Sequence, residues 1–459
     1  MKPTLHLNVF IPVAIFILAV LIRISLFVLF YSNERHNYAE FYGSAAIGLS
    51  HGKGLTYNFE EVSKIEETKN TDFTQNFNDF TSFKERHKWL YGLSGPVYAI
   101  YLLWVITHIY NFFPYIILQI LLDSIMITFL YIVAKKYLSR LVVYVLLFSL
   151  LFNPAAISDT LCVSYNFWAP LSVMIGFFGF LYAFSVEKNN HIFFLTGLFT
   201  AITLWFRDII NFLPFFLAFA IVFYYVFKKK TNPRKIFNKF VMYLLPVLIS
   251  ISLLSINRYQ NTGSFRPTQT FFWHAFFAAV GQFDNPYGIK DKDEVIWAFG
   301  SKLNPEIKMD DQFKYSENTS NIYEETLKKE GFKFIKEHPF IFIRNMIYRT
   351  GIMIAPTFFI VSGQYFSWIF NDIVAIFISI ILLILWILGL YHLFKTKSPL
   401  LYVIIPVYLY FFSIFSWYYL VGRVVLCFAF INIILYMYGL MCIYNLYLIP
   451  TITRKANRV

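Results

Sequence analysis

Five basic side chains lie inside or beside long apolar segments, where a charged group is energetically costly. Arg23 stands within the first apolar run, and Arg86 and Lys88 precede the second. Arg258 and Arg423 lie beside later apolar runs. A guanidinium meets phosphate oxygens through two parallel hydrogen bonds, so these residues are candidates for holding a phosphate group. The alternative is that Arg23 snorkels to lipid headgroups and that Arg86 and Lys88 contact headgroups.

Three carboxylates are candidates for a base or for a group that orients a base. Glu34 and Glu40 lie in the polar stretch after the first apolar run, and Asp159 lies shortly after Pro154. A carboxylate can accept the proton of a hydroxyl group as that hydroxyl attacks. The alternatives are that each glutamate is a solvated loop residue and that Asp159 is the N-cap of a helix.

The elements that must position these residues are membrane helices. The chain has 459 residues, of which 58% are hydrophobic and 14% are charged, whereas soluble proteins average about 45–50% and about 25%. Its apolar segments of about 17–25 residues fit single bilayer crossings. We expect an all-α polytopic membrane protein with about 10–12 transmembrane helices and two large extracytoplasmic loops that carry short interfacial helices. The expected division is a transmembrane module over 1–256 that includes the loop 32–92, a second loop over 257–340, and C-terminal helices over 341–459.

The distribution of charge predicts the topology. Most of the 26 acidic residues lie in 32–92 and 291–340, whereas the surplus of basic residues lies in short connectors near Lys135, Lys228 and Lys395. Basic short loops face the cytoplasm, so both polar stretches are expected outside. The net charge of +13 is therefore a topology signal, and nucleic-acid binding is not expected.

Two segments complicate the count of crossings. The stretch 95–134 holds two apolar segments but must cross an odd number of times. The segment 341–361 contains Arg344 and Arg349, so we expect it at the outer interface with these arginines snorkelling.

Metal ions and cofactors are not expected. The histidines show no ligand spacing, and the chain contains neither a G-x-G-x-x-G sequence nor a P-loop. Buried, inert thiols are expected for the cysteines, which all lie in apolar runs: Cys162, Cys427 and Cys442.

The second polar stretch has two patterned segments. Residues 320–340 have Tyr323, Leu327, Phe334 and Ile335 near helical spacing, which predicts an amphipathic surface helix that ends before Pro339. The aromatic run 271–277 is expected to anchor the chain at the membrane surface, with stacking on a sugar or contact with a prenyl chain as the alternative.

Several local patterns follow one another in the order of a known family. The segment "EFYGSAAIGLSHGKGL" (40–55) contains a Y-x3-A-x2-L-x2-G-x-G run from Tyr42 to Gly54. It is followed by "GLSGPVYAIYLL" (92–103), "LLFNPAAISDTL" (150–161), "GLFTAITLWFRD" (197–208), "SINRYQNTGSFRPTQT" (255–270) and "IKEHPFIFIRNMIYR" (335–349). Together these resemble bacterial GT-C glycosyltransferases that use polyprenyl-phosphate sugars, among them aminoarabinose transferases and protein O-mannosyltransferases.

The resemblance implies a catalytic acid in the first external loop and cations at the donor phosphate. The family usually carries an Asp three or four residues before the Tyr, where this chain has Tyr38 and Ala39. Glu40 lies two residues before Tyr42, and Glu34 lies four before Tyr38, so either glutamate can be the base. The implied cations are Arg23, Arg86, Lys88, Arg258 and Arg423.

The expected activity is transfer of a sugar, with inversion, from a polyprenyl-phosphate donor to a glycan, lipid or protein acceptor. The expected location is the bacterial inner membrane, where the multi-pass chain contacts lipids and its active site is extracytoplasmic. One alternative is a polysaccharide polymerase or ligase that uses a lipid-diphosphate glycan. Another is a lipid or solute transporter or flippase, which would need broken helices at the midplane and paired repeats.

Overall fold

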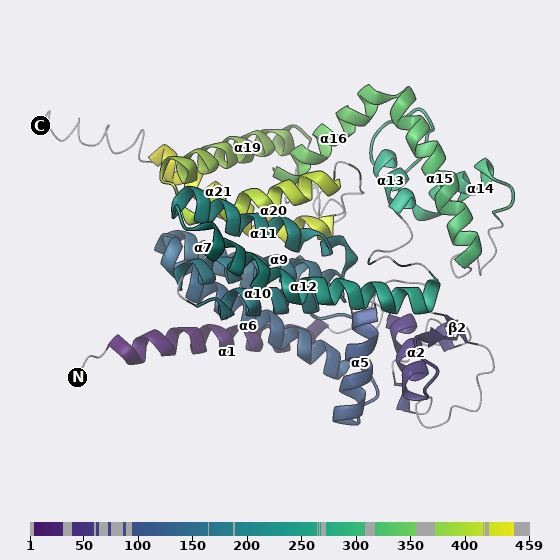
Figure 1. The fold of residues 1–459 in the computed structure, drawn as a ribbon, viewed down its shortest axis with the longest axis horizontal. Coiled ribbons are helices and arrows are strands. Elements are labelled where there is room, and N and C mark those ends of the chain that lie inside the picture. The colour runs from purple at the N-terminus through teal and green to yellow at the C-terminus, as the bar shows by residue number, and fades with distance from the viewer. Residues whose placement is uncertain are drawn as a thin grey trace, which may run out of the picture. The chain divides into compact units, whose positions relative to one another are not determined.

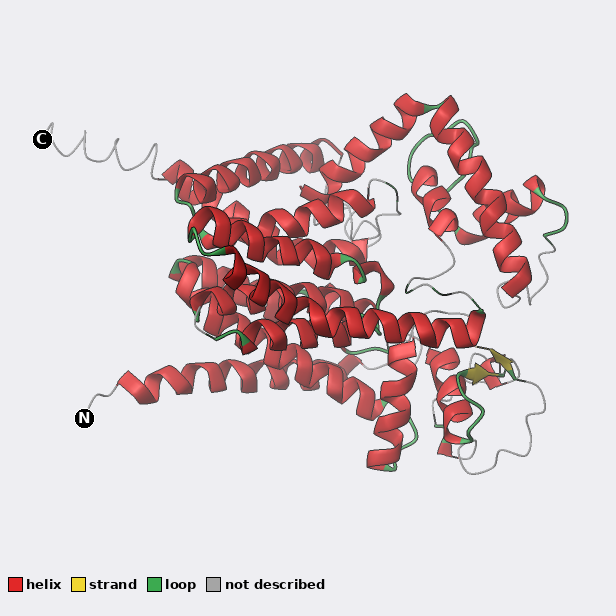
Figure 2. Ribbon diagram, viewed as in Figure 1, coloured by secondary structure: helices red, strands yellow, loops and turns green. Residues whose placement is uncertain are grey.

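The structure, a computed structural model, is built from helices (Figures 1 and 2). It describes residues 4–30, 39–58, 61–63, 72–74, 86–88, 94–163, 165–186, 189–263, 265, 267, 272–307, 317–354, 372–415, 417 and 422–444. The α-helices are α1 (Thr4–Phe30), α2 (Ala39–Ser50), α5 (Ser94–Thr107), α6 (Phe113–Tyr137), α7 (Arg140–Phe152), α8 (Pro154–Thr160), α9 (Trp168–Ser185), α10 (His191–Thr203), α11 (Leu213–Phe223), α12 (Pro233–Thr262), α13 (Phe272–Gly281), α14 (Asp293–Leu303), α15 (Glu317–Glu337), α16 (Pro339–Ile354), α19 (Asp372–Lys395), α20 (Pro399–Phe415) and α21 (Gly422–Ile443).

Shorter elements complete the described chain. They are the 3-10 helices η3 (Tyr165–Phe167) and η4 (Asp208–Ile210), the π-helix η5 (Tyr224–Lys228), and the antiparallel strand pair of β1 (Thr56–Tyr57) and β2 (His87–Lys88).

The prediction of an all-α polytopic membrane protein is confirmed. In the described residues, seven helices are long and apolar enough to cross a bilayer, and the bent pair α7–α8 raises this to eight. The seven spans are Phe10–Leu29, Phe113–Tyr137, Trp168–Ser185, Asp208–Lys228, Pro233–Asn261, Phe377–Lys395 and Leu426–Ile443. Large apolar side chains on their surfaces, such as Val28 at 75% exposure, suit contact with lipid.

The seven or eight candidate spans are fewer than the expected number of about 10–12, and the described residues hold four shorter apolar helices besides them. They are α5, α10, α13 and α20. Helix α5 has 14 residues and is about 21 Å long, which is shorter than a hydrocarbon core about 30 Å thick. In Figure 1, it runs across the direction of α6. The stretch 95–134 therefore needs only α6 to cross, which satisfies the odd count.

The chain forms two compact units. The first comprises Met1–Lys136, Leu147–Phe215 and Phe237–Thr270, and the second comprises Tyr137–Leu146, Phe216–Ile236 and Phe271–Val459. The division at 256 and 340, which refers to sides of a membrane, stays a prediction.

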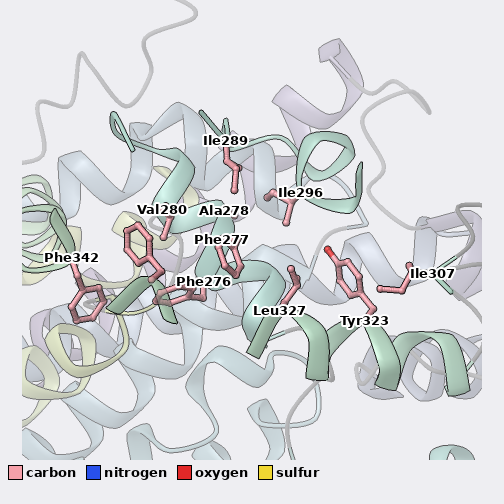
Figure 3. Close-up of a cluster of buried hydrophobic side chains, with 11 residues drawn as sticks. Phe276, Phe277, Ala278, Val280, Ile289, Ile296, Ile307, Tyr323, Leu327 and Phe342 are labelled. Carbon is pink, nitrogen blue, oxygen red and sulfur yellow. The ribbon is translucent and has the colours of Figure 1, made fainter. Parts of the chain in front are cut away.

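In the second unit, α13–α16 enclose an aromatic core (Figure 3). Phe276 and Phe277 of α13 are 1% and 0% exposed, so the expectation that this aromatic run anchors at the membrane surface or stacks on a sugar is wrong for these two rings. The amphipathic helix predicted over 320–340 is α15, and its apolar side chains Tyr323, Leu327 and Phe334 are fully buried in this core.

The expected snorkelling of Arg349 is also wrong. Its side chain is buried, and its Nε and Nη1 donate to the carbonyl oxygens of Phe415 and Ala279, each at 2.8 Å. These carbonyls lie at or near the C-terminal ends of α20 and α13, where helices leave carbonyl groups without partners and attract cations. Arg349 therefore joins two helix ends to α16.

Candidate functional site

The Y-x3-A-x2-L-x2-G-x-G run of the first polar stretch forms α2 and the turn that ends it. Tyr42 and Ala46 lie on buried faces of α2, at 2% and 0% exposure. Gly52 and Gly54 follow the helix with φ of 69° and 67°, in the left-handed region that favours glycine. The amide of Lys53 donates to the carbonyl of Gly48 and closes the helix end. The run thus turns the chain from α2 into β1.

A buried ion pair lies beneath this turn. Arg86 Nη1 is 3.3 Å from Glu61 Oε2, and the Glu61 side chain is 0% exposed. The Arg86 guanidinium also donates from Nη2 to the carbonyls of Ser44 and Thr56, at 2.6 and 3.0 Å, and from Nε to the Thr56 hydroxyl at 3.1 Å. Desolvation lowers the pKa of Arg86, and the Glu61 charge opposes that shift.

The same cluster holds the backbone at Asn58 and at Glu61. The Ser44 hydroxyl donates to Glu61 Oε2 and accepts from the amide of Asn58. The Asn58 side chain accepts from the amide of Glu61 at 2.9 Å. We call Ser44, Thr56, Asn58, Glu61 and Arg86 the loop cluster. It links α2, both sides of the strand pair and the segment 61–63.

Aromatic packing attaches the segment 72–74 to the connector between α5 and α6. Phe73 is 1% exposed and packs on Trp104 and Phe112, with ring centroids 5.1 and 5.2 Å apart. The amide of Phe73 donates to the carbonyl of Tyr110 at 2.8 Å. The polar stretch is therefore built onto the membrane helices at more than one place.

A second polar cluster lies at the bend between α7 and α8. The two helices differ by 51° in direction. Asn153 caps α8 by accepting from the amides of Ala155 and Ala156, and Pro154 has no N–H group for the carbonyl of Leu150. The carbonyls at the end of α7 therefore lose their usual helical donors.

Arg23 supplies donors to these carbonyls. Its Nη2 donates to Leu150 at 2.9 Å and its Nη1 donates to Leu151 at 2.7 Å. Its Nε donates to Asp123 Oδ2 at 2.8 Å, and its side chain is 0% exposed. All three guanidinium nitrogens thus have protein partners in this structure, where the sequence analysis expected a phosphate ligand or a snorkelling side chain.

Asp159 is held by the same face of α6. The Gln119 side chain, one turn before Asp123, donates to the carbonyl of Asp159 at 3.2 Å. Asp159 is 8% exposed and lies near the end of α8, whose N-cap is Asn153, so the alternative that Asp159 caps this helix is wrong. Helix α6 therefore contacts α8 through Gln119 and, one turn later, contacts Arg23 at the end of α7 through Asp123.

The other predicted site residues are placed as follows. Arg258 is buried near the end of α12, next to Asn257, whose side chain donates to the Tyr98 hydroxyl at 2.9 Å. Lys88 lies in β2 opposite Thr56, Glu40 lies in the first turn of α2, and Arg423 lies in the first turn of α21. The side chains of these three residues, and all of Glu34, fall outside the described part of the structure.

In the described residues, no three His, Cys, Asp or Glu side chains are grouped so as to hold a metal ion. His274 instead joins α13 to its neighbours, with Nδ1 2.7 Å from the Tyr323 hydroxyl and Nε2 3.1 Å from Asp293 Oδ1. The Glu324 carboxylate accepts from the amides of Trp273 and His274 at the start of α13, where negative charge is favoured.

Sequence reasoning missed Glu61 and Asp123 as site residues. The signal for Asp123 was present, because an acid within an apolar segment is a functional or structural candidate by default. Glu61 offered no such signal among the many acids of its stretch, since its burial depends on contacts with distant residues.

No family model, no curated protein and no solved structure matches this chain.

Proposed function

We propose that this protein is a membrane glycosyltransferase that moves a sugar from a polyprenyl-phosphate donor to a glycan, lipid or protein acceptor. The proposed setting is the outer side of a bacterial plasma membrane. The resemblance in the order of local motifs is the origin of the proposal, and one feature of the structure carries it further. The described residues of the polar stretch after the first span hold a buried ion pair and are attached to the connector between α5 and α6, as a catalytic loop must be and a plain connector need not be.

The proposed reaction needs a base and cations. Glu40 or Glu34 takes the proton of the acceptor hydroxyl as its oxygen bonds to the anomeric carbon, and the bond from that carbon to the phosphate oxygen breaks. The lipid phosphate leaves with the bonding electrons, and the configuration inverts. Asp159 would orient the acceptor or the base.

The cations proposed for the leaving phosphate are Lys88, Arg258 and Arg423. Arg23 and Arg86 are assigned a positioning role, because their guanidinium groups hold carboxylates and backbone carbonyls. In this proposal they fix the end of α7 and the loop cluster without touching the donor.

The test is turnover by the purified full-length protein in lipid. A panel of radiolabelled polyprenyl-phosphate sugars is supplied, and sugar release or transfer is measured for the unmodified chain and for Glu34→Gln, Glu40→Gln and Asp159→Asn. Glu66→Gln, in the same polar stretch, is the matched control. We expect one of the two glutamate variants to lose transfer while remaining folded, and the control to keep it.

Three outcomes distinguish the alternatives. Full activity in both glutamate variants would show that the base is another residue. Consumption of a lipid-diphosphate glycan instead of a lipid-phosphate sugar would support a polymerase or ligase. Binding or movement of a lipid without any bond cleavage would support a transporter.

A further inference from the structure

Helix α16 buries polar side chains and exposes apolar ones, which is the reverse of the pattern of a helix in water. Asn345 and Arg349 are 1% and 2% exposed, whereas Phe340, Ile343 and Ile347 are 85%, 51% and 62% exposed. The three exposed side chains follow helical spacing and form one stripe. A helix that buries Asn345 and Arg349 and exposes an apolar stripe is suited to lipid and not to water. Arg344, at the edge of the stripe, is partly buried, and its Nη2 donates to the carbonyl of Asp284 at 2.6 Å.

The C-terminal end of α16 reaches the middle of a membrane span. Asn432 Nδ2 donates to the carbonyl of Met353 at 3.0 Å, and the Tyr436 hydroxyl donates to the carbonyl of Ile354 at 2.6 Å. Both donors lie near the middle of the apolar span Leu426–Ile443 in α21. They satisfy the last carbonyls of α16, which hydrocarbon would leave without partners.

Asn432 is itself held in a polar network inside the helices of the second unit. The Tyr408 hydroxyl donates to Asn432 Oδ1, and Trp386 Nε1 donates to the Tyr408 oxygen at 2.9 Å. These residues come from α19, α20 and α21, so the end of α16 is fixed by all three helices.

The exposed side chains change from basic to aromatic to aliphatic along α15 and α16. Before Pro339, on the adjoining turns of α15, the exposed side chains include Lys329, Phe332, Lys333 and Lys336, and Glu337 is exposed beside them. Helical spacing places them on one face of α15, and Lys333 also pairs with Glu330 at 3.3 Å. After Pro339 come the aromatic Phe340 and then two isoleucines. Basic, aromatic and aliphatic side chains thus follow in the order of the layers of a bilayer, from headgroup to hydrocarbon.

We propose that α15–α16 form a lipid-binding surface on which α16 is a half-span. Ile347 and Ile343 contact acyl chains, Phe340 lies at the interface, and Lys336, Lys333 and Lys329 face the headgroup phosphates of anionic phospholipids. The helix is about 24 Å long, so a tilted α16 reaches from the headgroup region to the bilayer centre, about 15 Å below the edge of the hydrocarbon. This proposal does not rest on the proposed transferase activity.

The test is a depth profile along the stripe in the full-length protein. The three cysteines are buried and are first replaced by alanine. Spin labels are then attached in turn at Lys333→Cys, Lys336→Cys, Phe340→Cys, Ile343→Cys and Ile347→Cys in bilayers of phosphatidylglycerol and phosphatidylcholine. Collision with oxygen, which concentrates in hydrocarbon, is compared with collision with a water-soluble nickel chelate. Exposed Lys302→Cys in α14 is the water control, and Ile387→Cys, 53% exposed on α19, is the lipid control.

We expect the ratio of oxygen to nickel collisions to rise severalfold from position 333 to position 347, approaching the ratio at 387. Equal ratios along the stripe, or ratios like that at 302, would overturn the half-span. Low collision rates with both reagents would mean that protein covers the stripe, which also overturns the proposal.

The headgroup contact has its own comparison. We expect the label at position 340 to be less accessible to nickel in phosphatidylglycerol than in phosphatidylcholine. Replacing Lys329, Lys333 and Lys336 by glutamine should abolish that difference. If the unmodified lysines give the same accessibility in both lipids, the surface does not recognise anionic headgroups.

Discussion

The guanidinium of Arg23 replaces the backbone donors that the sequence Asn153–Pro154 removes from the end of α7. Hydrocarbon offers no water to satisfy such carbonyls, so a bend within the membrane needs a protein donor. The charge that comes with this donor needs a counter-charge, which Asp123 provides at 2.8 Å. The bend, the cation and the acid are therefore one structural device.

This arrangement predicts that Arg23 acts through stability. Arg23→Met leaves the Asp123 carboxylate and two carbonyls without this partner, and breaking a buried ion pair costs roughly 3–5 kcal/mol. We expect a clearly lower midpoint of thermal unfolding in detergent, whereas Arg234→Met, at an exposed residue early in α12, should change little. An unchanged midpoint, together with a raised KM for a lipid-phosphate donor, would instead return Arg23 to the phosphate-binding role.

The pair of Glu61 and Arg86 is expected to be coupled in the same way outside the membrane helices. Arg86→Met strands a buried carboxylate, while Glu61→Gln removes the charge that needs the arginine. The double variant should therefore be less destabilised than the sum of the two single variants, by roughly 1–3 kcal/mol. Chemical unfolding of the four proteins measures this energy. The exposed pair Glu325 and Lys328, treated identically, should give a value near zero, and equal values for the two pairs would contradict a buried role.

At the scale of elements, the position of α2 depends on the close approach of its backbone at Gly48 to β1, as well as on the turn that ends the helix. A Cβ atom added at Gly48 would lie 2.5 Å from the carbonyl oxygen of Thr56 and 3.1 Å from Arg86 Nη2, so β1 and the loop cluster would have to move. At Gly351 in α16, an added Cβ atom would meet nothing within 4 Å, and the backbone is helical.

These two glycines therefore form a matched pair of alanine substitutions. We expect Gly48→Ala to loosen the first polar stretch and Gly351→Ala to be neutral or slightly stabilising, because alanine favours helices. Limited proteolysis of the intact protein should cut Gly48→Ala faster within 32–92 and leave the pattern of Gly351→Ala unchanged. Equal protection of both variants would mean that the contact at Gly48 relaxes without consequence.

From the sequence, the positions of the helices could be predicted better than the contacts that each helix makes with the others. The periodicity of 320–340 identified α15 and its buried face, since that pattern records one side of one helix. The same pattern says nothing about what covers a residue, so the aromatic run of α13 was assigned to the membrane surface and Arg349 to headgroups. Both errors arise because burial was decided by α15, α16 and α20, which lie far along the chain.

At the scale of the whole molecule, the helices now allow a consistent path through the membrane. Helix α5 runs across the direction of α6 and is not counted as a crossing, and the proposed half-span at α16 would return the chain to the side from which it entered. The connectors with Lys135, Lys228 and Lys395 then fall on one side, provided that the bent pair α7–α8 and the short helix α10 cross as well. The positive-inside rule puts that side in the cytoplasm.

This path predicts which residues a membrane-impermeant thiol reagent reaches in intact cells. In a background without native cysteines, Lys53→Cys and Lys292→Cys, exposed in the two polar stretches, should react from outside. Lys229→Cys and Lys397→Cys, exposed in two basic connectors, should react only after the membrane is opened. Reaction of Lys53→Cys and Lys292→Cys from opposite sides would exclude a shared active site and the proposed transferase with it. If both react only from inside, the two polar stretches still share one side, but that side is the cytoplasm. The basic connectors would then lie outside, against the positive-inside rule.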